Sequence, residues 1–315
     1  MGRLRCGGTL PDSMATESRT LVVLALAANA GIAVTKFIAA GISGSSAMLA
    51  EGIHSVADTG NQLFLLRGEH VSRFEPDVHH PFGRGKELYF WGFMVAVFLF
   101  VAGGAFSIYE GIIKLANAEE HEPTGLVFSL VVLGIAGLFE AGVAFRPALR
   151  EFNRRRTGRA LVRTVRESKD PALLVVLFED SAAVVGLTIA AAGLIATHAT
   201  GSGVYDGLAS VLIGLLLTGV AWVIAIEMKA LLIGEAATRE DRAAIRAVTY
   251  GIDEVERVNR LLTMQLAPDE ILINMEVVFD AGLSQARLQQ AIGRIEAAVQ
   301  DVVPSASRIF IEPTI

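Results

Sequence analysis

The stretch AEGIHSVADTGNQ, residues 50–62, places a glutamate, a histidine and an aspartate between two apolar runs. An α-helix turns by about 100° per residue, so Glu51, His54 and Asp58 fall on one helix face, and Asn61 extends the same stripe. A charged side chain near the centre of a bilayer costs at least about 2.5 kcal/mol, and such residues normally face the protein interior and mark a pathway. The stretch therefore predicts a membrane helix with one polar, functional face.

The remainder of the 315-residue chain has the composition of a membrane protein. Hydrophobic residues make up 52% and the mean hydropathy is +0.51, both above the values of an average soluble domain. A helix needs about 20 residues to cross the hydrocarbon core. Five apolar runs reach that length, near 20–43, 88–117, 125–147, 171–197 and 204–233. The quoted stretch adds a sixth span, near 46–67, because the short turn GISGSS (41–46) leaves no room for a long loop. We predict an N-terminal tail (1–18), a domain of six transmembrane helices (19–233) and a C-terminal domain (234–315).

The loops between these spans differ in charge. Lys and Arg gather in the N-terminal segment, in the loop after the second span and between residues 146 and 169, whereas the loops at 41–46, 117–125 and 197–205 contain neither. The positive-inside rule then places both termini in the cytoplasm, and it explains the basic run without nucleic acid as a partner. Residues 1–19 lack the apolar core of a signal peptide, so we expect a multi-pass protein of the prokaryotic inner membrane. The single Cys6 excludes a disulfide framework and a cysteine zinc site.

The C-terminal segment is charged and shows mixed periodicities. A Thr cap and Gly251 bound a helix at 238–251, period-two alternation predicts strands at 255–267 and 270–280, and a helix at 284–303 and a strand at 307–315 follow. This order predicts a small α+β, ferredoxin-like cytoplasmic domain, which we expect to be a dimerisation module of a homodimer. The segment contains no His and no Cys.

A second polar group lies in the fifth span, where VVLFED (175–180) brings Glu179 and Asp180 into an apolar run. Asp58 lies about 18 Å from the outer end of its span, and Asp180 lies about 14 Å from the inner end of its own span. In a hydrocarbon core about 30 Å thick, these two residues therefore lie at nearly the same depth. An imidazole with carboxylates suits a first-row divalent metal, above all zinc, and disfavours magnesium and calcium. The candidate metal ligands are His54, Asp58, Asp180, Glu179 and Glu51.

These groups also take up protons when a metal leaves, so the chemistry predicted is exchange of metal for protons across the bilayer. The metal is a transported substrate, and no cofactor is expected. No His-Glu-x-x-His motif or other hydrolase signature is present, so an intramembrane metalloprotease or other enzyme is not predicted. We expect Glu140 to pair with a polar neighbour or relay protons, and Asp206 to cap the sixth span.

Several motifs together resemble the cation diffusion facilitator family of metal/proton antiporters. They are HSVAD (54–58), HPFGRGK (80–86) and YDGLASVLIG (205–214), and the resemblance covers residues from about 20 to 312. VVLFED and the terminal IFIEP (309–313) are similar to the branch that contains the animal zinc transporter nine proteins. The resemblance implies a transport site with paired ligands four residues apart on the second and fifth spans.

The chain departs from the family pattern at two places. The paired positions map to His54 with Asp58 and to Val176 with Asp180, and valine cannot bind a metal, so Glu179, Glu51 or a water would supply the fourth ligand. In the loop after the second span, Asp77 and His80 are present, but Arg84 stands where some relatives have a second metal-binding histidine, so that loop site is expected to be lost. Manganese, iron or cobalt remain alternatives to zinc, as does a non-transporting membrane metal sensor or scaffold.

Overall fold

The computed structural model describes residues 29–117, 126–146, 149–150, 153 and 169–314. The chain divides into two compact units, and each is built from several segments. The first comprises Met1–Leu63, Phe98–Ala144 and Glu179–Gly219, and the second comprises Phe64–Val97, Phe145–Phe178 and Val220–Ile315. Most long helices therefore contribute to both units. The division at residues 18 and 233 expected from the sequence stays a prediction.

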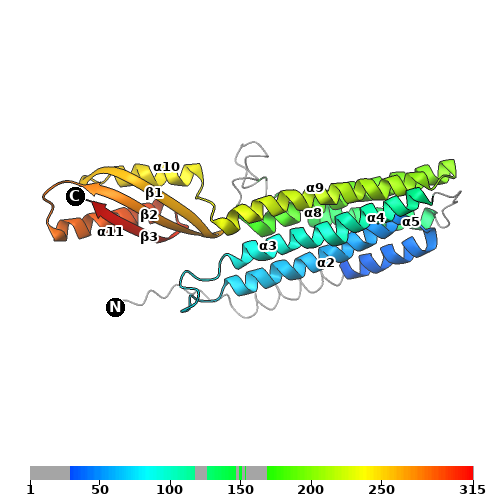
Figure 1. The fold of residues 1–315 in the computed structure, drawn as a ribbon, viewed down its shortest axis with the longest axis horizontal. Coiled ribbons are helices and arrows are strands. Elements are labelled where there is room, and N and C mark those ends of the chain that lie inside the picture. Colours follow the sequence, from blue (N-terminus) through cyan, green and yellow to red (C-terminus); the bar gives the residue numbers. More distant parts are fainter. Residues whose placement is uncertain (1–28, 118–125, 147–148, 151–152, 154–168, 315) are drawn as a thin grey trace. The chain divides into compact units, whose positions relative to one another are not determined.

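Apolar helices make up most of the described chain before residue 234 (Figure 1). They are a first helix Asn29–Ser43, α2 (Ser46–Ser72), α3 (Glu87–Phe98) continued by the π-helix η1 (Leu99–Ala105) and α4 (Phe106–Ala116), α5 (Leu126–Phe139) continued by the π-helix η2 (Glu140–Phe145), α8 (Pro171–Thr200) and α9 (Val204–Ile233). Gly44 and Gly201 adopt positive φ angles of 63° and 69° between consecutive helices, where residues with a Cβ are disfavoured.

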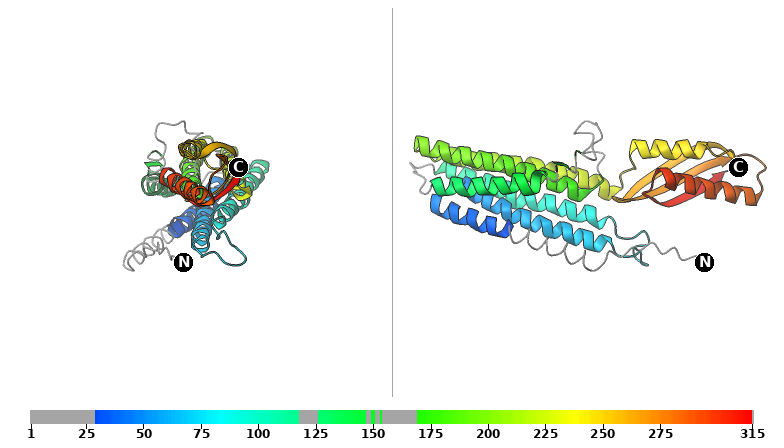
Figure 2. Two further views of the ribbon diagram at one scale, coloured as in Figure 1. Left: turned by 90° about the vertical axis from the view of Figure 1, so that its left-hand side faces the viewer. Right: turned by 180° about the vertical axis from the view of Figure 1, so that it is seen from behind.

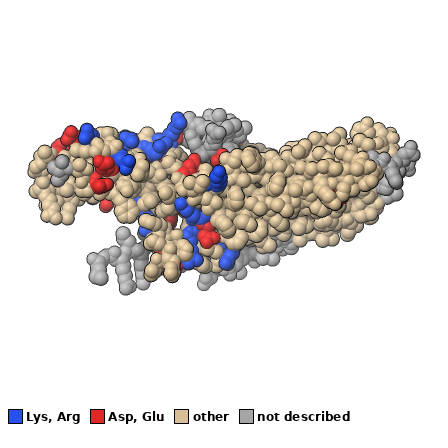
Figure 3. Space-filling model, in the orientation of Figure 1, with Lys and Arg blue, Asp and Glu red and all other residues tan. Residues whose placement is uncertain are grey.

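Three of the described helices are long and apolar enough to cross a membrane: Glu87–Ala116, Pro171–Thr200 and Val204–Ile233. The helices Asn29–Ser43 and Leu126–Gly142 are apolar but shorter. Large apolar side chains such as Val127, Leu138 and Trp222 are 69–78% exposed, as expected for helices that face lipid. On the face drawn in Figure 3, charged side chains gather on the second unit, whereas the visible surface of the first unit consists of other residue types. The count of six spans stays a prediction.

Asp206, the third residue of α9, does not cap its own helix, which corrects the expectation from the sequence. Its carboxylate accepts hydrogen bonds from the hydroxyls of Ser45 and Ser46 and from the backbone N–H groups of Ser46 (2.6 Å) and Ala47 (3.3 Å). The side chain therefore caps the N-terminus of α2, where unpaired N–H groups and the helix dipole favour a negative charge. Local sequence reasoning assigned the aspartate to the nearer helix because the partner helix lies 160 residues away in the chain.

Helices of the first unit meet where glycines leave backbone atoms in contact. A Cβ added at Gly214 would lie 2.7 Å from the carbonyl oxygen of Gly104, and one added at Gly111 would lie 2.7 Å from the carbonyl oxygen of Gly207. The segment from η1 to α4 and the helix α9 thus share a glycine seam, which we define by these four residues. Such contacts are typical of helices that associate within membranes.

The C-terminal part of the second unit contains the elements expected from the sequence (Figure 2). They are α10 (Arg239–Tyr250), β1 (Val255–Ala267), β2 (Glu270–Phe279), α11 (Gln285–Val302) and β3 (Ala306–Thr314). Thr238 accepts a hydrogen bond from the N–H of Asp241 and Ser284 one from the N–H of Arg287, so both helices begin at the side-chain caps that the sequence indicates.

The three strands form a mixed sheet in the order β1–β2–β3, with β1 antiparallel to β2 and β2 parallel to β3. Alternate residues of β2, Ile271, Ile273, Met275 and Val277, are at most 2% exposed and share one apolar core with Ile245 of α10 and with Ala291, Ile295 and Val299 of α11. Both helices consequently cover the same face of the sheet. This arrangement confirms a small α+β domain; its ferredoxin-like classification stays a prediction.

Candidate metal site

The polar face of α2 predicted from the sequence is buried within the first unit. Glu51, His54 and Asn61 are at most 1% exposed, and the side chain of Asp58 is 15% exposed. His54 Nδ1 lies 3.3 Å from Asp58 Oδ1, one helical turn away. Neither ring nitrogen of His54 has a hydrogen-bond partner among the described residues, although both atoms are buried. Buried polar atoms nearly always find hydrogen-bond partners in folded proteins, so an imidazole without hydrogen bonds marks a place for a ligand or a proton.

Helix α8 brings its own carboxyl groups to this face. Asn61 Nδ2 donates a hydrogen bond to Glu179 Oε1, and the carboxyl group of Glu179 lies close to that of Asp58. Asp180 follows, partly buried, and its Oδ2 atom has no hydrogen-bond partner among the described residues. Asp180 interacts electrostatically with Glu179. The structure thus places His54 and Asp58 of α2 and Glu179 and Asp180 of α8 in one buried region. We call these four residues the acidic cluster.

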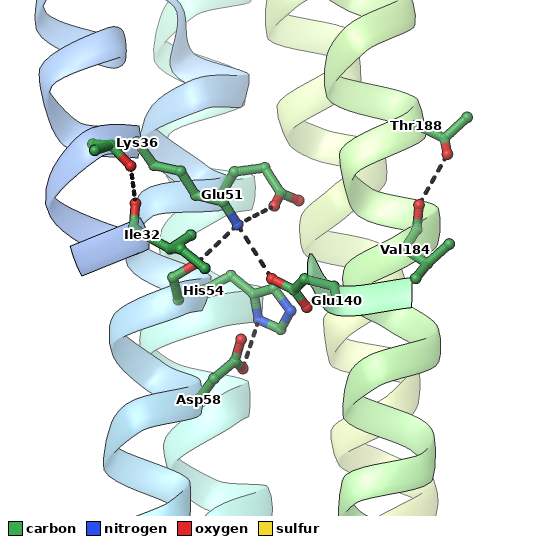
Figure 4. Close-up of polar contacts among 10 residues, drawn as sticks. Ile32, Lys36, Glu51, His54, Asp58, Glu140, Val184 and Thr188 are labelled. Atoms are coloured by element: carbon green, nitrogen blue, oxygen red, sulfur yellow. Dashed lines mark hydrogen bonds and ion pairs between the residues drawn. The ribbon is translucent and has the colours of Figure 1, made fainter. Parts of the chain in front are cut away.

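A lysine that the sequence reasoning missed joins this region (Figure 4). Lys36 of the first helix is completely buried, and its ammonium group lies 3.1 Å from Glu51 Oε2 and 3.6 Å from Glu140 Oε1. It also donates a hydrogen bond of 2.8 Å to Ser55 Oγ. Glu140, the first residue of η2, therefore has a polar partner, as expected. The signal in the sequence was a single lysine within the apolar run GIAVTKFIAAG (31–41).

The backbone of α8 approaches Glu51 closely. A Cβ added at Gly186 would lie 2.5 Å from Glu51 Oε1, so a larger residue at this position would force the carboxylate to move. Glu51 is thereby enclosed between Gly186 on one side and Lys36 on the other.

The candidate ligands lie near one another, but they do not form a closed metal site. Among the residues that the structure describes, no three His, Cys, Asp or Glu side chains converge on a common point. Val176 is partly buried on α8, four residues before Asp180, and supplies no donor atom. Binding of a metal by His54, Asp58, Glu179 and Asp180 therefore requires side-chain rearrangement within the acidic cluster.

The loop that follows α2 is held by an ionic contact within the second unit. Asp77 Oδ1 accepts hydrogen bonds from the backbone N–H groups of His79 and His80, and Asp77 Oδ2 accepts one of 2.8 Å from Arg84 Nη2. The hydrogen bond from Arg84, followed by the one from the His80 backbone, holds the pKa of Asp77 well below its usual range. The Arg84 guanidinium also lies 5.7 Å from the ring centre of Phe74. Arg84 thus neutralises the carboxylate that a loop metal would share, which supports the expected loss of that site.

Comparison with known protein families agrees with this architecture. The model of the cation efflux transmembrane domain matches residues 22–233, and the model of the cation efflux protein cytoplasmic domain matches residues 237–313. The chain is a multi-pass membrane protein of the transporter class, and not an enzyme. It belongs to the cation efflux family, the cation diffusion facilitators, as the motifs in the sequence indicated.

Individual relatives match over different lengths of the chain. Metal tolerance protein C4 of Arabidopsis thaliana is 30% identical over 284 residues, which cover 90% of this chain and 62% of the relative. The mitochondrial proton-coupled zinc antiporter SLC30A9 of Mus musculus is 30% identical over 281 residues, covering 87% of this chain and 49% of the relative. The manganese efflux system protein MneP of Bacillus subtilis is 27% identical over 119 residues, covering 38% of this chain and 40% of the relative. The chain spans between about half and two thirds of the first two relatives.

Proposed function

We propose that this protein exports zinc, or a similar divalent cation, from the cytoplasm in exchange for protons. The metal would bind in the acidic cluster through His54, Asp58, Asp180 and Glu179, near the middle of the bilayer. Glu51 was a further candidate metal ligand from the sequence, and its carboxylate is ion-paired with Lys36. The proposal extends to a homodimer with both termini in the cytoplasm of a prokaryotic cell, located in the inner membrane.

The observation that carries this proposal is the excess of buried acid around the imidazole of His54, whose ring nitrogens have no hydrogen-bond partner among the described residues. In the part of the first unit that the structure describes, Glu51 and Glu140 are ion-paired with the ammonium of Lys36, and three further carboxyl groups, those of Asp58, Glu179 and Asp180, lie together beside them. Buried charges that lack compensation are very costly, so protons or metal cations must balance this excess. A cluster that needs either protons or a divalent cation has the chemistry of an exchanger.

The donor types favour zinc. One imidazole with several carboxylates suits zinc and other first-row metals, whereas magnesium and calcium prefer oxygen ligands alone. The relative named a proton-coupled zinc antiporter matches most of this chain, which supports both the metal and the counter-ion.

Manganese is the second candidate among the metals. Val176 removes one ligand from the pair on α8, so carboxylates outnumber imidazole in the cluster, and carboxylate oxygens suit manganese. A relative named a manganese efflux system protein matches over part of the chain. Iron and cobalt share the same ligand chemistry, and a metal sensor or scaffold without transport is the remaining alternative.

Uptake into proteoliposomes tests the proposal. The purified chain would be reconstituted, a pH gradient imposed and zinc entry followed with a trapped fluorescent indicator, for the unmodified protein and for Asp58→Asn and Asp180→Asn. Asp269→Asn, in the exposed turn between β1 and β2, is the matched control. We expect both cluster variants to lose gradient-driven uptake and the control to retain it. Uptake of manganese but not zinc would change the substrate, and transport of no metal would refute the exchanger.

A further inference from the structure

The ammonium group of Lys36 has the surroundings of a bound cation. Its three N–H donors face three oxygen groups, the carboxylates of Glu51 and Glu140 and the hydroxyl of Ser55, at 3.1, 3.6 and 2.8 Å. These oxygens come from α2 and η2, and Lys36 reaches them from the first helix (Figure 4). We call the three oxygen groups the upper cage.

We propose that Lys36 is a tethered cation that occupies the upper cage and thereby confines the transported metal to the neighbouring side chains His54, Asp58, Glu179 and Asp180. This inference rests on the proposed function and deepens it, because it assigns the carboxylates of the region to two different partners. Glu51 and Glu140 belong to Lys36, and the carboxylates of Asp58 and α8 belong to the metal.

The contacts of Glu51 support this division. Oε2 is paired with the ammonium of Lys36, and Oε1 faces the backbone of Gly186 across a gap too narrow for a Cβ. To reach a metal at His54, the carboxylate would have to leave Lys36. The buried ammonium would then lose one of its two acid partners, which is strongly unfavourable in an apolar surrounding.

The charge of Lys36 also acts on the metal directly. A divalent cation placed among the upper-cage oxygens would lie within a few ångströms of an ammonium group, and like charges repel strongly where water is scarce. Lys36 is therefore a positioning residue: it contacts the acids beside the site and determines where a second cation can bind.

Metal stoichiometry distinguishes this role from a purely structural one. The full chain would be purified in detergent, equilibrated with zinc at near-neutral pH, passed over a desalting column and analysed for bound zinc by mass spectrometry. We expect Lys36→Met to hold one more zinc ion per chain than the unmodified protein, because the upper cage becomes available to a free cation. Lys36→Arg restores the tethered charge and should return the stoichiometry to that of the unmodified protein. Lys114→Met is the matched control, since Lys114 binds only the carbonyl oxygen of Gly44 among its described hydrogen bonds.

A second measurement leaves Lys36 in place and so does not depend on the folding of the lysine variants. Zinc affinity would be measured by competition with a chelating dye for Glu51→Gln and Asp58→Asn. Removal of an outer partner typically costs about 10–100-fold in metal affinity, so we expect a loss of at most about 100-fold for Glu51→Gln and a larger loss for Asp58→Asn.

The outcomes separate the two proposals. A Lys36→Met protein that gains no zinc, or a Glu51→Gln protein that loses as much affinity as Asp58→Asn, would overturn the tethered-cation role. Failure of the unmodified protein to bind zinc would count against the proposed function, but a zinc ion gained on Lys36→Met would still support the upper cage as the place of the tethered cation.

Discussion

Replacement of Asp206 by alanine should destabilise the protein far more than a typical surface substitution. The side chain is 2% exposed, and its carboxylate accepts hydrogen bonds from Ser45, Ser46 and Ala47 at the start of α2. Loss of a helix cap costs about 1 kcal/mol. The substitution also leaves the hydroxyl of Ser45 and the N–H of Ser46 without their acceptor, at about 1–3 kcal/mol for each buried donor. Together these terms predict a loss of about 3–7 kcal/mol in the free energy of unfolding.

The assay is equilibrium unfolding of the full chain in mixed detergent micelles, followed by circular dichroism. Asp269→Ala, at the exposed turn of the C-terminal domain, serves as the control and should change stability by no more than about 0.5 kcal/mol. A loss below about 1.5 kcal/mol for Asp206→Ala would refute the reasoning, since it would mean that water replaces the carboxylate and that the donors are not left unpaired.

Three further predictions concern other parts of the chain. Arg84→Ala should raise the pKa of Asp77 towards its ordinary value, measured by NMR titration. In the native protein the pKa of Asp77 lies below its unfolded value of about 4, so Asp77 stabilises the fold at pH values above about 4 and this stabilisation is lost as the pH falls. The decrease in the free energy of unfolding at acid pH should therefore be smaller in Arg84→Ala. Gly214→Ala would place a methyl group 2.7 Å from a backbone carbonyl oxygen and should cost about 1–3 kcal/mol in thermal unfolding, whereas Gly219→Ala meets no atom within 4 Å and should not destabilise. Ile273→Ala, at a fully buried position of strand β2, should cost about 2–5 kcal/mol and increase hydrogen exchange in the C-terminal domain; unchanged exchange would contradict the assigned core.

The C-terminal domain could be predicted almost residue by residue. Its strands alternate because one sheet face is covered by α10 and α11 and the other is open, and both helices begin at a Thr or Ser side chain that local sequence rules recognise. Local pattern and tertiary packing agree there. The pairing of β2 with β3 in parallel was not contained in those rules, because it depends on the path of α11 between them.

The membrane-embedded region was predicted less completely. The period of the α-helix was enough to place Glu51, His54 and Asp58 on one face, and an estimate of depth associated them with Glu179 and Asp180. Lys36 was missed because nothing in an apolar run shows which acid a lone lysine will meet. The role of Asp206 was wrong for a related reason: a cap is read from neighbours in the sequence, and here the capped helix begins with Ser45 and Ser46. Interactions between distant helices are decided by packing, which one sequence does not display.

The glycine seam of Gly104, Gly111, Gly207 and Gly214 has a mechanical consequence. Helices that interlock through large side chains must lift those side chains out of their grooves before one helix can move along the other. Across this seam, backbone atoms of α9 and of the segment from η1 to α4 meet directly, and side chains of the facing helix also lie against the glycines, namely those of Ile108, Leu115, Val211 and Thr218. Because each glycine receives a side chain of the facing helix, the contact resists sliding as well as separation. It has the properties of a fixed joint in the same unit that holds the acidic cluster.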